Sequence, residues 1–369
     1  MSRKKKIFFS LAIGIVLSGI ALYITFKNIP LEDLAAYLKT INYWWTVPTV
    51  IVVFTGFVLR VIRWQLLLGP VKKTSFFDAF HPLMIGFSLN CLLPARIGEL
   101  ARPAIFCKKE KVPFSKVLAT VGAERVFDVA VLLLFFAVVL ATVEINPNLD
   151  LTFGKYHLNK ATLERVGMTT LKLCLAMLAL IALIIARQSH TVIRRAILQS
   201  PKLFFFLSNS FKENLREGLC TKLVYVFDNF ASGFDLLKSP KKLALCLALS
   251  LLVWIFSGLS YYTLAFGCPG IEISFLEMCA VMVILCFFIS LPSVPGFWGL
   301  WEAGGVFGLM IFGVSAKEAA GFTLANHVFQ MVPVIVIGLI SLVITGVSVA
   351  QLGYDAKIED KAAGGKSLD

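Results

Sequence analysis

Charged residues are scarce in this chain. Only 15% of its 369 residues are Asp, Glu, Lys or Arg, 58% are hydrophobic, and the mean hydropathy is +0.83. Soluble globular proteins carry about 25% charged residues. The composition excludes a water-soluble fold, and the long apolar runs predict an all-α integral membrane protein with many spans.

The sequence also lacks the patterns that hold metals, disulfides or nucleotides. None of the eight cysteines forms a CxxC pair, the four histidines are scattered without an HExxH, and no nucleotide-binding loop is present. Most of the cysteines lie in apolar stretches, where cysteine packs as a small hydrophobic residue. We therefore expect no cofactor and no metal. Since no nucleotide-binding loop is present, we expect any energy input to come from an ion gradient or from downhill exchange.

Basic residues outnumber acidic ones. The chain has 35 Lys and Arg against 22 Asp and Glu, a formal net charge of +13. Because the basic residues lie between apolar runs, anionic lipid head groups and the positive-inside rule explain them more simply than nucleic acid does. We expect membrane lipids as partners and no nucleic acid.

Six apolar runs are long enough to cross a bilayer, which takes about 20 residues. They are Ile7–Phe26, Trp44–Leu66, Val117–Val143, Thr169–Ala186, Leu243–Phe266 and Ala319–Val349. The first run follows a basic N-terminus, as in a signal peptide. It is too long for one, however, and no A-x-A cleavage site follows. We therefore expect it to be a retained helix.

Two further apolar segments are interrupted by proline and glycine. Phe76–Leu93 is followed by such a break and a short apolar piece ending at Phe106, and Leu276–Leu291 by a break and a piece ending near Phe312. Each half is at or below the length of a span, and broken backbone is tolerated at membrane depth only where protein or a water-filled cavity covers it. The pattern predicts two re-entrant helical hairpins.

The distribution of Lys and Arg predicts the topology. Most of them lie in segments 1–6, 60–75, 107–116, 187–242 and the C-terminal tail, which places both termini in the cytoplasm and the chain in the plasma (inner) membrane. The first hairpin then enters from the cytoplasm and the second from the opposite side.

The transmembrane domain is expected to cover residues 1–350, with a cytoplasmic insertion at 187–242. Leu215, Leu219 and Leu223 recur there at helical spacing between polar residues. This is typical of amphipathic helices that lie on the inner leaflet or pack on the bundle. Residues 351–369 are polar, and we expect them to be disordered.

The two opposed hairpins suggest an inverted repeat. Residues 123–128, Ala-Glu-Arg-Val-Phe-Asp, align with residues 325–330, Ala-Asn-His-Val-Phe-Gln. Both stretches lie early in the long helix that follows a broken hairpin. Repeats of this kind are common in transporters.

Ionisable residues at membrane depth are rare and mark candidate functional sites. The candidate substrate-binding residues are Arg96, Glu99 and Arg102 in the first hairpin, Glu124, Arg125 and Asp128 in the helix after it, Glu302 in the second hairpin, and Asn326 and His327 in the last helix. Guanidinium groups suit phosphate because they present a planar fork that stays charged.

Two interpretations of this cluster stay open. The arginines could hold a phosphate while the carboxylates keep them paired when no ligand is bound. Alternatively, the charges could form a structural ion-pair network between the first hairpin and the third spanning helix. Buried pairs often add no stability and only fix how two elements align. A hydrated position near the outer interface is a further possibility for Glu302.

Three motifs carry a family resemblance. They are Leu-Pro-x-Arg-x-Gly-Glu-x-x-Arg at 93–102, Glu-Arg-x-x-Asp at 124–128, and Pro-x-x-Pro-Gly-x-x-Gly-x-x-Glu at 292–302. In this order and spacing, the chain resembles the lysylphosphatidylglycerol synthase transmembrane-region family, also called the flippase-like domain family, over about residues 5 to 350.

The resemblance implies a plasma-membrane protein that moves a lipid with a charged or phosphate-bearing head group between leaflets. An anionic phospholipid or a polyprenyl-phosphate-linked lipid would be the cargo. The chain lacks the C-terminal aminoacyl-transferase domain of the bifunctional relative, so lysyl transfer is not implied. Two alternatives are a membrane-embedded transferase acting on a lipid-linked phosphate, and a non-catalytic membrane partner for a soluble lipid-modifying enzyme on the cytoplasmic face.

Overall fold

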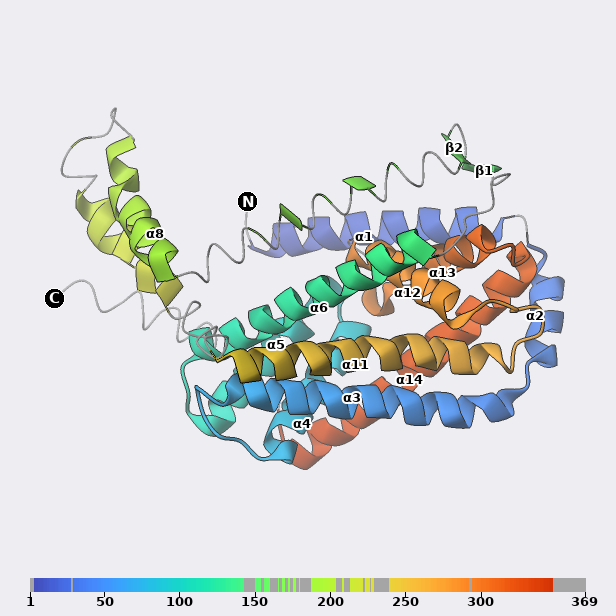
Figure 1. Cartoon of the computed structure of the whole chain (residues 1–369), viewed down its shortest axis with the longest axis horizontal. Coiled ribbons are helices and arrows are strands. Elements are labelled where there is room, and N and C mark those ends of the chain that lie inside the picture. Colours follow the sequence, from blue (N-terminus) through green and yellow to red (C-terminus); the bar gives the residue numbers. More distant parts are fainter. Residues whose placement is uncertain are drawn as a thin grey trace.

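The computed structural model is a bundle of helices, as the sequence predicts (Figure 1). It describes residues 3–27, 29–142, 150–153, 156–159, single positions between 165 and 179, residues 187–203, parts of 208–228, and residues 239–291 and 294–347. The predicted span Thr169–Ala186, apart from five single positions, and the tail 351–369 lie outside the described residues.

The first half of the chain forms helices close to the predicted ranges. They are α1 (Arg3–Phe26), α2 (Leu31–Thr40), η1 (Tyr43–Trp45), α3 (Thr46–Leu68), α4 (Phe76–Leu92), η2 (Pro94–Arg96), α5 (Gly98–Glu110) and α6 (Phe114–Thr142). The helix α2 was not predicted. It is short and amphipathic, and Tyr37 on its buried face donates a hydrogen bond to the carbonyl of Pro269 at 2.8 Å.

The second half repeats this order. It comprises α11 (Pro240–Ala265), α12 (Phe275–Ser290), η6 (Pro295–Phe297), α13 (Leu300–Ile311) and α14 (Ala316–Thr345). Between the halves lie the antiparallel strands β1 (Asp150–Phe153) and β2 (Tyr156–Asn159), α8 (Arg187–Gln199), η3 (Ser200–Leu203) and the π-helical turn η4 (Arg216–Cys220). Of the leucines predicted to recur there, Leu219 and Leu223 are exposed and Leu215 is half-buried.

Among the described residues, three helical stretches are long and apolar enough to cross a membrane. They are Tyr43–Leu68, Pro240–Ala265 and Ala316–Thr345, and α1 with α2 would make a fourth if this bent pair is one span. The apolar helices establish a membrane protein, whereas the count of six spans stays a prediction.

Both predicted hairpins are present. The helices α4 and α5 pack on each other, as do α12 and α13. At 17, 13, 16 and 12 residues, all four are shorter than the roughly 20 residues that a span needs. Each hairpin begins with a capping box, formed by Ser75 with Asp78 and by Ser274 with Glu277.

The hairpins start from opposite ends of the bundle, and their tips meet. The start of α3 lies beside the end of α11, where Asn42 N donates to Gly267 O at 2.8 Å, so the two helices are antiparallel (Figure 1). Since α4 follows the end of α3 and α12 follows the end of α11, the hairpins approach each other. At the tips, Arg96 Nη2 donates to Ile289 O at 2.7 Å.

The structure supports the inverted repeat. The helix α4 packs on α14 and α12 packs on α6, so each hairpin contacts the long helix of the other half. Arg96 and Phe297, the last residues of η2 and η6, both adopt positive φ, +51° and +61°. Glu124 and Asn326 are each the eleventh residue of their helix, since α6 begins at 114 and α14 at 316.

Two arginines lie elsewhere than predicted. The sequence placed Arg60 and Arg63 in the last part of the span Trp44–Leu66 and counted them with the inside segment 60–75; α3 continues to Leu68, and Arg63 is only 1% exposed inside the bundle. The helix continues past these charges because both have polar partners inside the bundle, described below.

Candidate functional site

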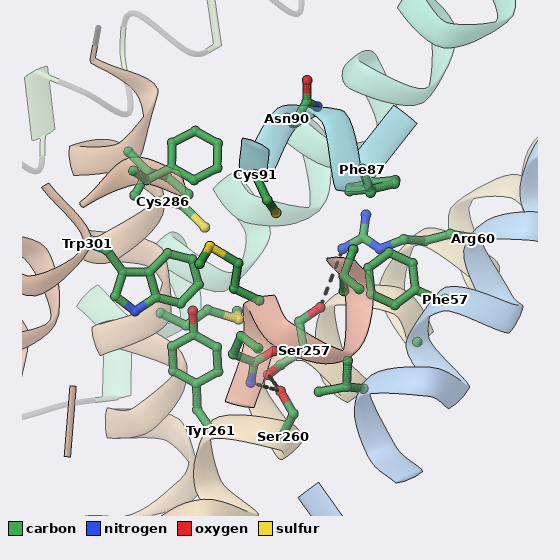
Figure 2. A pocket seen from close by; sticks show the side chains of 18 of the residues that line it. Phe57, Arg60, Phe87, Asn90, Cys91, Ser257, Ser260, Tyr261, Cys286 and Trp301 are labelled. Atoms are coloured by element: carbon green, nitrogen blue, oxygen red, sulfur yellow. Dashed lines mark hydrogen bonds between the residues drawn. The ribbon is translucent and has the colours of Figure 1, made fainter. Parts of the chain in front are cut away.

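A cavity of about 270 Å³ lies where the two hairpin tips meet. Its walls come from α3, α4, α6, α11, α12 and α14 together with both tips. Much of the wall is aromatic, including Phe57, Phe87, Tyr261 and Trp301 (Figure 2). We call this space the central cavity. It joins both halves of the repeat at the position where broken backbone needs a polar, covered environment.

Three guanidinium groups line the central cavity. Arg60 comes from α3, Arg96 from the first hairpin tip and Arg125 from α6. Arg96 has Glu99 at a long 3.9 Å, and Arg125 has Asp128 at 3.5 Å. Within the described residues, Arg60 has no carboxylate in salt-bridge range. Its Nη2 donates only a long hydrogen bond to Ser257 Oγ at 3.5 Å (Figure 2).

Aromatic rings stabilise two of these cations, Arg60 and Arg96. The guanidinium carbon of Arg60 lies 5.7 Å from the ring centroids of both Phe87 and Trp254. That of Arg96 lies 5.5 Å from the ring of Phe297, on the other hairpin tip. Such cation–π contacts contribute about 0.5–2 kcal/mol each, less than a carboxylate partner at this depth would. The cavity therefore presents positive charge that its own carboxylates do not fully compensate.

A buried ion-pair network lies beside the cavity and joins α3, α5 and α6. Arg102 Nη1 donates to Glu124 Oε2 at 2.6 Å, and Arg63 Nη1 donates to Asp128 Oδ1 at 2.6 Å. The two pairs are linked by Arg63 Nε and Glu124 Oε1, 3.7 Å apart. All four side chains are at most 5% exposed. The structure thus contains the network between the first hairpin and the third spanning helix that the sequence left as one alternative.

Neutral side chains complete this network. Asp128 Oδ1 also accepts from Trp254 Nε1 at 3.2 Å, and Arg63 Nη1 also donates to Ser250 Oγ at 2.8 Å, so α11 is joined as well. The guanidinium of Arg102 lies on the ring of Trp64, 3.6 Å from its centroid. Arg102 is thus buried, and it is not among the residues that line the central cavity.

The second half of the repeat has its own buried pair. His327 Nδ1 lies 2.6 Å from Glu302 Oε1, and His327 Nε2 lies 2.7 Å from Gly296 O. The other carboxylate oxygen of Glu302 accepts from Gly299 N at 2.6 Å. The imidazole stacks on Trp301, with centroids 4.6 Å apart and planes 7° from parallel. Glu302 is 0% exposed, so the hydrated outer position considered for it is wrong.

The predicted site residues therefore divide into two groups. Arg96, Glu99, Arg125 and His327 line the central cavity. The others lie behind its wall: Arg102, Glu124, Asp128, Glu302 and Asn326. Asn326 is 1% exposed and its Oδ1 accepts from Gln330 Nε2 at 3.3 Å, while Gln330 itself reaches the cavity.

Sequence reasoning missed Arg60 as a cavity residue and Arg63 as a network residue. Both lay within the predicted span Trp44–Leu66 but were counted as bases of the inside segment 60–75, so neither was considered as a charge inside the bundle. One signal was available: the apolar residues resume at Leu66, Leu67 and Leu68, one turn after Arg63. Arginines followed by a further apolar turn indicate charges inside a helix.

Comparison with known proteins agrees with the resemblance seen in the motifs. The family model described as lysylphosphatidylglycerol synthase TM region matches residues 11–338. Curated proteins and solved structures gave no significant match. The matched range includes both hairpins, the central cavity and both buried pairs, and the family indicates a function related to membrane lipids. The chain belongs to the lysylphosphatidylglycerol synthase transmembrane-region family.

Proposed function

We propose that this protein moves a lipid with a phosphate-bearing head group between the leaflets of the plasma membrane. The observation that carries the proposal is the central cavity, where three arginines from different helices meet at the tips of two opposed hairpins. An apolar bundle has no structural need for three guanidiniums around one space. A ligand of opposite charge gives them a role.

The charge balance favours an anionic head group. The cavity and the adjacent network hold five arginines and three carboxylates, namely Arg60, Arg63, Arg96, Arg102, Arg125, Glu99, Glu124 and Asp128. Two positive charges are left over, and they would balance the two negative charges of a phosphate monoester dianion. A phosphodiester would still find a net positive site.

The size of the cavity favours a head group without its chains. Pockets for drug-sized ligands measure about 300–1,000 Å³. The cavity, at about 270 Å³, falls just below that range. The acyl or prenyl chains would remain in the bilayer while the head group passes between the hairpin tips. Membrane lipids are thus the proposed partners. We also propose that both termini are cytoplasmic, as the distribution of Lys and Arg predicts.

The geometry changes which arginines we assign to phosphate. Arg102 was a candidate, but its pair with Glu124 and its contact with Trp64 give it a structural role. Arg60 replaces it, because it lines the cavity and lacks a carboxylate partner within the described residues. The proposed phosphate ligands are Arg60, Arg96 and Arg125.

A reconstituted-vesicle assay with labelled lipids tests the proposal. The panel would include phosphatidic acid, phosphatidylglycerol, a polyprenyl phosphate and a lipid without phosphate. We expect wild-type protein to move one or more of the phosphate lipids. The triple variant Arg60→Gln, Arg96→Gln, Arg125→Gln should fold and lose that movement.

Two further variants sharpen the assay. The triple lysine variant keeps the charge but loses the bidentate fork, so lipid movement should fall while the fold is kept. Arg216→Gln, an exposed arginine outside the bundle, is the matched control and should behave as wild type. Normal phosphate-lipid movement by a well-folded triple Gln variant would contradict the proposed site.

A further inference from the structure

The Glu302–His327 pair poses a problem of proton number. Gly296 O is a carbonyl and can only accept, so the 2.7 Å contact requires a proton on His327 Nε2. The 2.6 Å contact between Nδ1 and Glu302 Oε1 also requires a proton between the two atoms. A neutral imidazole carries one proton, and an ionised carboxylate carries none.

The pair therefore holds one proton more than a neutral histidine and an ionised glutamate together. The proton makes either an imidazolium beside a carboxylate or a neutral imidazole beside a carboxylic acid. No change of tautomer removes the need for it, because each tautomer of neutral imidazole satisfies one contact and sets two lone pairs against each other at the second. Loss of this proton must break a hydrogen bond between side chains that are at most 1% exposed, which costs about 1–3 kcal/mol.

The two contacts of His327, with Gly296 O and with Glu302, join α14 to the second hairpin. Gly296 O belongs to η6, and Glu302 belongs to α13, where it also accepts from the N-cap Gly299 N. The proton thus stabilises the hairpin in the position seen here, and its release favours separation of the tip from α14. His327 lines the central cavity, which gives the proton a route to water.

Few other ionisable groups face this pair. Tyr261 of α11 stacks on Trp301, and Cys286 of α12 lines the cavity nearby. Across the cavity lie Arg60 of α3, Arg96 of η2, Glu99 of α5 and Arg125 of α6. In its described part, α1 contributes Ser18, whose hydroxyl accepts from Val294 N at 3.2 Å. No carboxylate other than Glu302 lies in ion-pair range of His327 among the described residues.

We propose that the Glu302–His327 pair is a proton-binding site that couples lipid movement to a proton gradient. The proposal rests on the proposed function and names its coupling ion. A proton from water on one side of the cavity binds the pair when the second hairpin closes on α14. When the tip moves away, the pair returns to carboxylate and neutral imidazole, and the proton leaves to water on the other side. One proton accompanies each lipid.

The proton count can be measured without transport. In the full-length protein with ¹⁵N-labelled histidine and ¹³C-labelled glutamate, the signals of the pair are those missing from His327→Gln and Glu302→Gln. At pH 6 we expect either an imidazolium with a carboxylate or a neutral imidazole with a carboxylic acid. A neutral imidazole together with an ionised carboxylate would overturn the proton site, whatever the protein transports.

Coupling is measured in vesicles that contain a labelled anionic phospholipid, with membrane potential clamped and a difference of one pH unit imposed. One proton per lipid predicts about a tenfold steady-state enrichment of the lipid in one leaflet for wild type, since one pH unit corresponds to a factor of ten in equilibrium. Glu302→Gln, whose amide mimics the protonated acid, should show no enrichment. Glu277→Gln, the same change at the other end of this hairpin, is the matched control and should keep it.

The outcomes separate the two proposals. Lipid movement by wild type that ignores the pH difference overturns the coupling and leaves the proposed function in place. Enrichment that persists in Glu302→Gln assigns the coupling to another group and also overturns it. A wild type that moves no phosphate lipid overturns the proposed function. The coupling falls with it, and the spectra then decide separately whether the pair binds a proton.

Discussion

The strongest structural prediction concerns Arg102. Replacement by methionine keeps an unbranched stem and removes the charged guanidinium, so Glu124 Oε2 loses its partner at 2.6 Å. Breaking a buried ion pair from one side costs about 3–5 kcal/mol, because the remaining charge stays buried without compensation. Arg63 Nε, 3.7 Å from the other oxygen of Glu124, compensates in part. We therefore expect a loss near the lower limit, about 3 kcal/mol.

Two further variants separate the contributions. Arg102→Lys keeps the charge but loses the planar contact with Trp64, and the expected loss is about 1 kcal/mol. The double variant Arg102→Met, Glu124→Leu removes both charges. It should recover at least half of the loss in the single variant, because apolar replacement of a buried pair is often neutral. Asp128 remains available to Arg63 in that variant, so no cation is left alone.

The assay is the free energy of unfolding in mixed micelles, measured by titration with a denaturing detergent. Lys72→Met is the matched control, because Lys72 pairs with Glu110 at the same 2.6 Å but is 43% exposed. Exposed pairs contribute about 0–1 kcal/mol, so this variant should be close to wild type. If Arg102→Met loses no more stability than Lys72→Met, or if the double variant is no better than the single one, the reasoning is wrong.

Two other predictions follow from the hairpins. In Gly98→Ala the added Cβ would overlap the carbonyl oxygen of Gly86, so α4 and α5 must separate, and we expect a loss of about 1–3 kcal/mol in the same titration. Gly218→Ala has open space and should be neutral; equal stability of the two variants would contradict the close hairpin packing. In a cysteine-free background, a probe that cannot cross the membrane should label Lys111→Cys only from the cytoplasm and Glu272→Cys only from outside. Labelling of both from the same side would contradict the opposed hairpins.

Much of the fold could be predicted because the local sequence alone identifies membrane helices. The length of each apolar run and its proline and glycine breaks located both hairpins to within a few residues. The broken halves could only be covered hairpins, because unsatisfied backbone is too costly in lipid. By contrast α2, with ten residues and three charged side chains, has no such signal, and its position depends on the contact of Tyr37 with Gly321 and Pro269.

The site could be predicted only in part, because pairing is a tertiary property. The spacing of Glu124 and Asp128 showed that they share a helix face, but not which arginines they meet. Arg63 is 65 residues from Asp128 in the chain and lies against it because α3 packs on α6. Similarly, the sequence placed Glu302 in the second hairpin without showing that it pairs with His327, whose ring contacts two tryptophan rings.

The two halves of the repeat differ in the chemistry that holds their hairpins. In the first half, Arg102 of α5 pairs with Glu124 of α6, and in the second, Glu302 of α13 pairs with His327 of α14. An arginine stays protonated at any physiological pH, so the first pair is permanent, whereas the second pair is the one proposed above to bind and release a proton. A lipid carrier, which is the function proposed above, must open toward one leaflet at a time, and two chemically equal pairs would favour neither opening. On this basis we expect the second hairpin to move and the first to stay fixed. That asymmetry would make a symmetric fold directional.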